Sequence, residues 1–285
     1  MDEKQYHDLL EKIEISNRPR GNSYAIELLE AFDSFGIKSF YKYSKYHEVY
    51  TRDIIENNNF HLSPLSVLND PAEHAFGHMK IVSDKKTKLM IDESLTFAEK
   101  QLYTYLNDQN YEEASNLLKD NTLICSLTTD GLSQAMWAHY ADDYNGLCIE
   151  YDAKEILVYT AGKVAPILYS NVAPDVYVSD NLSFLKSMRK VSFSKSDKWS
   201  NEKEWRVSKV VLDANYSNLT DLEKKNIEND RDYTFKPKSV TVGYNMDELI
   251  KNEILNLCRR NDIPMFCVKK RVEGYKLVRV PYPCR

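Results

Sequence analysis

The sequence predicts an α+β protein whose mixed or antiparallel central sheet is flanked by helices. Segments with strand periodicity and segments with helical periodicity follow one another irregularly, without regular β–α–β units. A long charged helical stretch interrupts the strands at about residues 90–120. A chain of 285 residues is at the upper end for one domain. We therefore expect an N-terminal helical segment over 1–36 and a single α+β domain over 37–285, with a helical insertion at about 90–120.

Local patterns set the expected elements. Apolar residues at helical spacing predict two helices at the start of the chain, and Gly36 ends the second. Two prolines and an Asn-Asp pair predict a turn over 63–73. The insertion reads as a helical hairpin broken near 107–110. The predicted helices span 3–15, 22–35, 49–57, 92–119, 133–144, 181–190 and 246–261, and the predicted strands span 37–43, 59–63, 122–127, 147–151, 163–169, 205–212, 239–243, 265–271 and 275–280.

Composition and charge narrow the class of protein. The net charge of −5 gives no global attraction toward nucleic acid or an anionic membrane. No apolar run approaches the roughly 20 residues of a membrane-spanning helix, and the first residues lack the pattern of a signal peptide. We expect no membrane partner and a cytoplasmic location. Five cysteines without a C-x-x-C pair predict free thiols, with neither a disulfide framework nor a zinc knuckle.

Two glutamates and an arginine lie among two tryptophans in the stretch W-S-N-E-K-E-W-R (199–206). In a strand that begins at Glu202, period two places Glu202, Glu204 and Arg206 on one face, while Trp205 enters the core. Paired carboxylates beside a cation can stabilise positive charge in a transition state or orient a hydroxyl. The alternative is an edge strand with a solvated acidic face and a cross-strand salt bridge, which contributes little stability.

A histidine and a tyrosine adjoin the third tryptophan in A-M-W-A-H-Y-A (135–141). On the predicted helix, Met136, His139 and Tyr140 fall on one side, and Trp137 pairs with Tyr140 one turn later. His139 can hydrogen-bond a ligand or act as an acid or a base. A histidine satisfied by backbone at a helix–sheet interface is an equally good interpretation.

Polar residues follow the first two predicted strands. Tyr41, Lys42 and Tyr43 end the first strand, and the turn after the second contains Asn69, Asp70, Pro71 and Glu73. Side chains at strand ends beside such turns are well placed to line a cleft. The alternative is that N-D-P only makes a good turn.

Several common site types lack their residues. The chain has no G-x-G-x-x-G, no G-x-x-x-x-G-K-[ST] and only eight glycines, so few backbone segments could cradle phosphate. No H-E-x-x-H and no spaced His/Cys cluster is present, so no metal is predicted. The chain contains no G-x-S-x-G, so a serine hydrolase is not predicted.

The order of these motifs carries a family resemblance. K-Y, N-D-P-x-E, W-A-H-Y-A with a following G-x-C-I, W-x-x-E-x-E-W-R and V-x-x-G-Y occur in that order over about residues 38–282. In this respect the chain resembles the bacterial domain-of-unknown-function 2971 family. More distantly it is similar to the ADP-ribosyltransferase superfamily, in which three core strands supply a His or Arg, an aromatic or Ser, and a Glu often within E-x-E. This second similarity is an analogy at the level of fold.

The analogy implies that NAD is the substrate. It implies that Glu204 holds the ribose 2′-hydroxyl and stabilises an oxocarbenium-like transition state as nicotinamide leaves. Glu202 would orient the acceptor, and Arg206 would hold Glu204 or a phosphate.

The same analogy implies the groups that would hold the nucleotide. Lys42 or Tyr43 would contact the adenosine side of NAD, and His139 or Tyr140 would pack on the nicotinamide. Asn69, Asp70 and Trp137 complete the expected binding residues. Lys42 or Tyr43 stands where the superfamily has His or Arg, and the His-Tyr pair lies on a predicted helix where the superfamily has a strand.

We therefore expect an ADP-ribosyltransferase-like or NAD-cleaving enzyme, in a toxin or phage-defence setting, with an unidentified macromolecular acceptor. One alternative is a non-catalytic sensor module that binds a nucleotide or sugar in the same aromatic cleft. A second alternative is a nucleic-acid-processing protein that uses the basic clusters at 259–260 and 269–271. The acidic net charge of the chain argues against this alternative.

Overall fold

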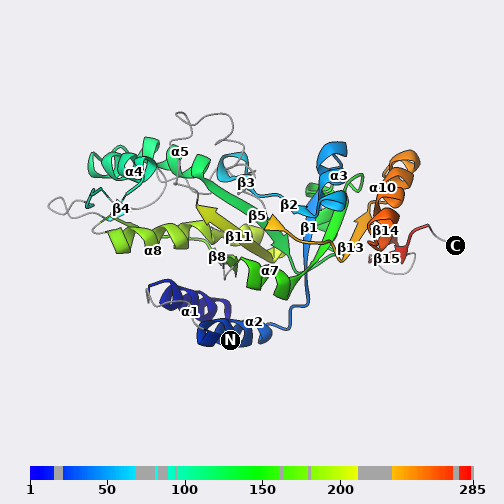
Figure 1. Ribbon diagram of the computed structural model, residues 1–285, viewed down its shortest axis with the longest axis horizontal. Helices are drawn as coiled ribbons and strands as arrows, with labels where there is room; N and C mark the ends of the chain where they lie inside the picture. Colours follow the sequence, from blue (N-terminus) through cyan, green and yellow to red (C-terminus); the bar gives the residue numbers. More distant parts are fainter. Residues whose placement is uncertain are drawn as a thin grey trace.

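A nine-stranded sheet forms the centre of the fold in the computed structural model, which describes residues 1–15, 22–68, 81–82, 89–93, 95–160, 163–178, 181–210, 233–271 and 276–283 (Figure 1). Within the sheet, β13 and β14 run parallel and the other neighbours are antiparallel, which confirms the predicted α+β class. Its strands, in spatial order, are β15 (Leu277–Pro281), β14 (Met265–Lys270), β13 (Ser239–Val242), β6 (Leu147–Asp152), β1 (Ser39–Ser44), β5 (Thr122–Thr128), β11 (Glu204–Val210) and β7 (Val164–Pro166), with β3 (Ser63–Pro64) on β5.

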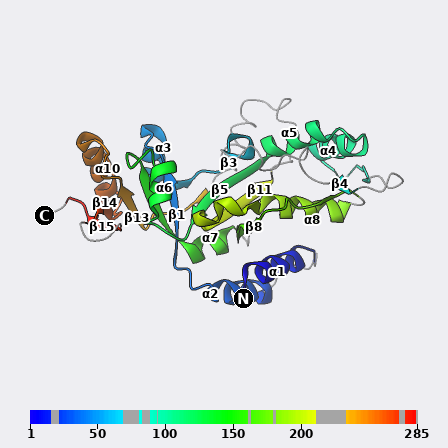
Figure 2. The ribbon, with the colours of Figure 1, turned by 180° about the vertical axis from the view of Figure 1, so that it is seen from behind.

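Helices cover the two faces of this sheet unequally. Alternation along β6 places Leu147, Ile149 and Tyr151 in the cores of one face and Cys148 in the core of the other. The first face packs against α1 (Glu3–Ile15), α2 (Asn22–Asp33), α3 (Glu48–Glu56), α7 (Ala153–Tyr159) and α10 (Glu248–Arg260). The short α6 (Gln134–His139) packs on the opposite face and is visible beside β1 in Figure 2.

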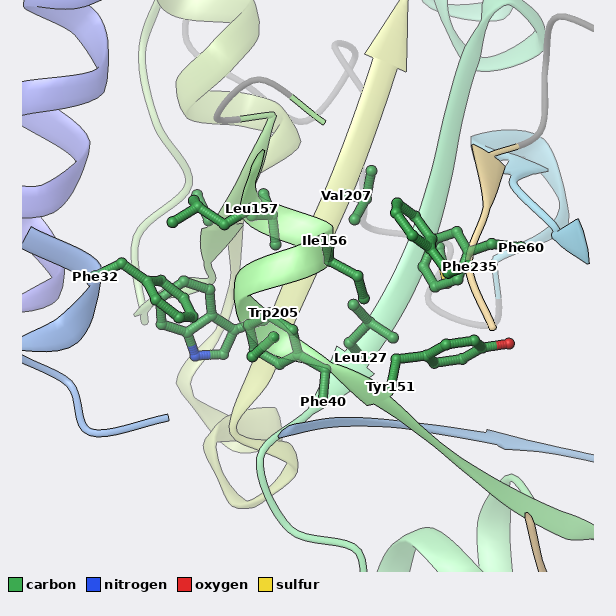
Figure 3. Packing of buried hydrophobic residues seen from close by; sticks show 14 of the residues in the cluster. Phe32, Phe40, Phe60, Leu127, Tyr151, Ile156, Leu157, Trp205, Val207 and Phe235 are labelled. Atoms are coloured by element: carbon green, nitrogen blue, oxygen red, sulfur yellow. The ribbon is translucent and has the colours of Figure 1, made fainter. Parts of the chain in front are cut away.

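Trp205 belongs to the larger core, where Figure 3 shows it beside Phe32 and Phe40. Its indole lies 5.7 Å from the ring of Tyr6 in α1 and 5.5 Å from the ring of Phe32 in α2, in edge-to-face contacts. Such aromatic pairs contribute about 0.5–1.5 kcal/mol each beyond the burial of their area. The N-terminal helices therefore support β11 from the face opposite its charged residues.

The predicted helical insertion forms a second lobe. It contains α4 (Phe97–Asn107), which begins with a capping box between Thr96 and Glu99, and α5 (Tyr111–Asn121). These helices share a separate hydrophobic core with α8 (Asn181–Ser192). Both ribbon views place this lobe at the end of the molecule far from α10 and β15 (Figures 1 and 2).

The sheet divides between β1 and β5. Only one residue pair, Tyr41 with Thr128, links these strands, whereas β1 pairs with β6 over six residues and β5 with β11 over seven. The two halves of the sheet therefore diverge at this junction. Glu202, Glu204, Arg206, Tyr43 and Tyr140 lie around it.

Three predicted elements differ from the observed ones. The helix expected over 133–144 ends at His139, because Asp142, Asp143 and Tyr144 all adopt positive φ. The strand expected over 163–169 divides, because β8 (Leu168–Ser170) leaves the main sheet to pair with β10 (Ser194–Ser196). The strand expected over 59–63 divides into β2 (Asn59–Phe60), which pairs with β12 (Tyr233–Thr234), and β3.

Candidate functional site

A cleft opens where the two halves of the sheet diverge. It holds about 80 Å³ of room, enough for a small group, and it opens to solvent at its mouth. Side chains from β1, β5, α6, β10, β11 and the 3₁₀ helix η3 (Asp197–Glu202) meet there. The lining residues are Tyr41, Tyr43, Leu68, Ser126, Leu127, Met136, Tyr140, Lys195, Trp199, Glu202, Glu204 and Arg206.

Glu204 and Arg206 form a buried ion pair on β11. Arg206 donates from Nε to Glu204 Oε1 at 2.9 Å and from Nη1 to the carbonyl of Ser192 at 2.9 Å, and its Nη2 lies 2.7 Å from Glu204 Oε1 in an ion pair. The Arg206 residue is 0% exposed. Burial raises the pKa of Glu204, but the positive charges of Arg206 and Lys195 lower that pKa further, so it lies below its ordinary value. Glu204 is therefore an anion at neutral pH.

Lys195 joins the two glutamates. Its Nζ lies 2.8 Å from Glu202 Oε2 and 3.2 Å from Glu204 Oε2, and all three side chains are less than 10% exposed. The hydroxyl of Tyr140 donates to the remaining Glu202 oxygen, Oε1, at 2.5 Å. Burial, together with the Glu202 carboxylate, raises the pKa of Tyr140, so its hydroxyl stays protonated as a donor. Two anions and two cations thus form one connected network.

Glu202 reaches this network from a turn and not from a strand, which corrects the predicted E-x-E-x-R strand. Residues 197–202 form η3, and Lys203 at its end has φ 48, in the left-handed region. This backbone reversal separates Glu202 from β11, which begins at Glu204. The Glu202 carbonyl is fixed by the Thr128 hydroxyl, which donates at 2.8 Å. The two glutamates therefore converge because of the turn, without sharing a strand face.

The interpretation of this motif as a solvated strand edge is also wrong. β11 lies between β5 and β7, and Glu204 is only 4% exposed. Transfer of an ion pair out of water carries a penalty that excellent geometry must offset. Buried networks of paired charges such as this one occur both at functional sites and as structural ion pairs.

Aromatic rings form much of the cleft wall. The Trp199 ring lies 5.1 Å from Lys195 Nζ, in a cation–π contact. Tyr43 donates from its hydroxyl to the carbonyl of Asp130 at 2.9 Å, which holds its ring in place. Trp137 lies behind Tyr43, fully buried, with the two rings edge to face at 5.3 Å. Of the predicted binding residues, Tyr43 thus lines the cleft and Trp137 supports it.

Other predicted residues lie elsewhere. Lys42 points to the face opposite Tyr43, where its Nζ donates to the carbonyl of His61 at 2.8 Å and lies over the Phe60 ring. His139 is exposed and does not line the cleft, because two residues along a helix rotate its side chain by about 200° from buried Trp137. Asn69 and Asp70 lie outside the described residues.

Sequence reasoning missed Lys195 altogether and assigned no role to Trp199, whereas it placed Tyr41 with Lys42 and Tyr43 at a strand end that could line a cleft. Lys195 lies on a three-residue strand whose partner is β8, and nothing in the surrounding S-F-S-K-S predicts that pairing. Tyr41 and Trp199 were accessible to prediction. Tyr41 shares the strand face of Tyr43 by period two, and Trp199 precedes Glu202 in the acidic motif.

Two other site types find no support in the described residues. No group of three or more His, Cys, Asp or Glu side chains there is arranged to hold a metal ion. The basic clusters are separated, because Arg259 and Arg260 end α10 at the start of β14, whereas Lys269 and Lys270 lie at the end of that strand. In the same ranges, no helix is both long enough and apolar enough to cross a membrane.

Part of the chain is similar to a known protein family. A family model described as "Protein of unknown function (DUF2971)" matches residues 136–207. The matched stretch runs from α6 into β11, so the similarity covers Tyr140, Lys195, Trp199 and both cleft glutamates. Neither the curated proteins nor the solved structures include a match to the chain.

Proposed function

We propose that the cleft binds NAD and breaks the bond between its nicotinamide and ribose, so that the ADP-ribosyl group passes to an acceptor or to water. The observation that carries this proposal is the convergence of Glu202 and Glu204 on one aromatic-walled cleft, with Lys195 between them. Cleavage of a glycosidic bond passes through an oxocarbenium-like transition state, which a neighbouring carboxylate stabilises. Two carboxylates at one site suit a reaction that needs both charge stabilisation and proton transfer.

The two glutamates take different roles in the proposed reaction. Arg206 keeps Glu204 ionised and immobile, so Glu204 is the electrostatic partner of the developing positive charge on ribose. The C1′–N1 bond breaks, its electron pair leaves with nicotinamide, and the acceptor oxygen bonds to C1′. Glu202 accepts the acceptor's proton, and its hydrogen bond from Tyr140 sets the direction of the carboxylate.

The aromatic wall supports the binding part of the proposal. Tyr43, Tyr140 and Trp199 line the cleft, and aromatic rings suit a flat heterocycle better than purely aliphatic walls do. We leave Lys42 and His139 out of the proposed site because neither lines the cleft. Asn69 and Asp70 directly follow Leu68, a lining residue, and stay candidate binding residues.

Release of nicotinamide from NAD tests the proposal. The purified chain should release nicotinamide, and Glu204→Gln should abolish the release while circular dichroism confirms that the variant is folded. Tyr140→Phe should lower the rate by one to two orders of magnitude, since it removes the hydrogen bond that directs the Glu202 base. Glu253→Gln, on the exposed surface of α10, is the matched control and should be fully active. Equal activity in Glu204→Gln would overturn the assignment.

A non-catalytic nucleotide- or sugar-binding module is the second candidate. The observation that favours it is the complete ion pairing of Glu204, with Arg206 on one oxygen and Lys195 on the other. A carboxylate held in this way suits a fixed binding surface. This candidate predicts that a nucleotide raises the melting temperature of the protein without forming any product, since ligand binding stabilises a fold whether or not chemistry follows.

A further inference from the structure

The ammonium of Lys195 lies in a cage of anionic and aromatic groups. Glu202 Oε2 and Glu204 Oε2 are 2.8 and 3.2 Å from Nζ, and the Trp199 ring centre is 5.1 Å away. The Lys195 side chain is only 8% exposed. Carboxylates combined with an aromatic face are the groups by which proteins recognise ligand cations. The cage is therefore built for a cation, and a side chain of the protein supplies one.

The two cations of the network are held very differently. Arg206 projects from β11 inside the sheet and also binds the Ser192 carbonyl, so it cannot leave without breaking the core. Lys195 projects from β10, which pairs only with β8 among the described strands and is not part of the nine-stranded sheet. Its ammonium is a point charge on a flexible four-carbon stem. Lys195 can therefore swing out of the cage while the strands stay in place.

Withdrawal of Lys195 leaves a site that requires one positive charge. Glu202 and Glu204 contribute two negative charges and Arg206 contributes one positive charge, so the remaining network carries a net charge of −1. A buried net charge is costly unless it is paired. A ligand that brings a single positive charge restores neutrality, whereas a neutral ligand does not.

The shape of the cleft restricts the ligand further. Met136 and the rings of Tyr43, Tyr140 and Trp199 lie around the carboxylates, which suits a flat ring better than an extended aliphatic amine. We propose that the cleft recognises a ligand with a cationic aromatic ring of the pyridinium type, and that Lys195 is the internal cation which this ring displaces. The inference rests on the proposed function only for the choice of pyridinium, since oxidised nicotinamide is such a ring.

Calorimetric titration with a non-cleavable probe tests the inference. The probe is 1-methylnicotinamide, a pyridinium cation, and nicotinamide is its neutral counterpart. Lys195→Ala should bind 1-methylnicotinamide at least about tenfold more tightly than the unmodified chain does, because the competing ammonium is gone. Lys198→Ala, an exposed lysine of η3, is the matched control and should leave the affinity unchanged. In the Lys195→Ala background, Glu202→Gln should remove the preference for the charged ring.

A labelling measurement on the unmodified chain keeps the inference testable if the Lys195 variants do not fold. Acetic anhydride acetylates accessible amines, and mass spectrometry reports the modification of each lysine. Saturating 1-methylnicotinamide should raise the acetylation rate of Lys195 several-fold, while that of Lys198 stays constant. Unchanged or slower acetylation of Lys195 would overturn displacement, as would equal affinity of Lys195→Ala for the charged and neutral rings.

The outcomes also separate this inference from the proposed function. Displacement of Lys195 by 1-methylnicotinamide without any cleavage of NAD would uphold the cation site and refute the enzymatic proposal. Release of nicotinamide from NAD without displacement would do the reverse.

Discussion

Removal of the Arg206 guanidinium by Arg206→Met should destabilise the fold strongly. The variant leaves Glu204 buried with Lys195, at 3.2 Å, as its remaining cation, and the Ser192 carbonyl loses a donor. Breaking a buried ion pair by removing one partner costs about 3–5 kcal/mol, and loss of a hydrogen bond adds about 1 kcal/mol. Because Lys195 compensates in part, we expect a total near 4 kcal/mol. With an unfolding entropy of about 2.1 cal/mol/K per residue, the melting temperature should fall by about 7 °C.

A double-mutant cycle isolates the ion pair from the packing of the side chain. Glu204→Gln alone leaves Arg206 buried without its anion, whereas Glu204→Gln with Arg206→Met removes both charges. Urea denaturation should show that the double variant is less destabilised than the sum of the single variants by at least about 2 kcal/mol. Additive losses, within about 0.5 kcal/mol, would refute the conclusion that these two side chains form an energetically coupled pair.

The pH dependence of the stability that Arg206→Met loses supplies an independent check. In the unmodified protein the pKa of Glu204 is depressed, so the stability it contributes is present above its unfolded pKa and is lost as pH falls through the folded value. Without Arg206, burial dominates and the pKa of Glu204 rises. The variant then gains a proton as the pH falls, and the stability difference between the two proteins should shrink from pH 7 to pH 4. A difference that grows on acidification would contradict the assigned cause.

Three further predictions concern other parts of the fold. Burial lowers the pKa of His7 to about 4, so on acidification the unfolded chain takes up a proton before the folded protein does. Between pH 7 and pH 4 the free energy of unfolding should therefore fall by up to about 3 kcal/mol from this cause. Urea denaturation should show that His7→Gln does not suffer this part of the fall. Lys203→Gly should stabilise the fold by about 0.5–1 kcal/mol, because Lys203 has φ 48; a lower melting temperature would refute this. Gly243→Ala should cost more than about 2 kcal/mol, because its Cβ would collide with the Tyr144 carbonyl, whereas Gly36→Ala, with open space at φ 66, should cost about 1 kcal/mol. Similar melting temperatures for the two glycine variants would remove the steric explanation.

Most long elements could be predicted because their hydrophobic period is local information. The helical spacing of 3–15 corresponds to α1, and the broken pattern of 92–119 corresponds to the α4–α5 hairpin. The short elements escaped prediction. α7 depends on Asp152, the last residue of β6, whose side chain accepts from two backbone N–H groups at the helix start.

The candidate site was predictable only in part. The two glutamates of the E-x-E motif line the same cleft, yet the predicted strand geometry would have placed them on one face of β11. Lys203 in a left-handed conformation directs Glu202 into the cleft from η3 instead. A lysine at positive φ has no local sequence signature, since the conformation is imposed by the packing on either side of it.

The sequence by itself determined the chemical inventory of this protein, namely two glutamates, an arginine and three tryptophans within short motifs, and it determined the α+β class through periodicity. Only the tertiary structure decided which of these residues meet. It brought Lys195 between Glu202 and Glu204, placed Tyr43 and Tyr140 in the cleft, and left Lys42 and His139 outside it. The physical reason is that periodicity reports on a residue's own element, whereas convergence depends on strand pairings between distant segments, such as β8 with β10 and β1 with β5.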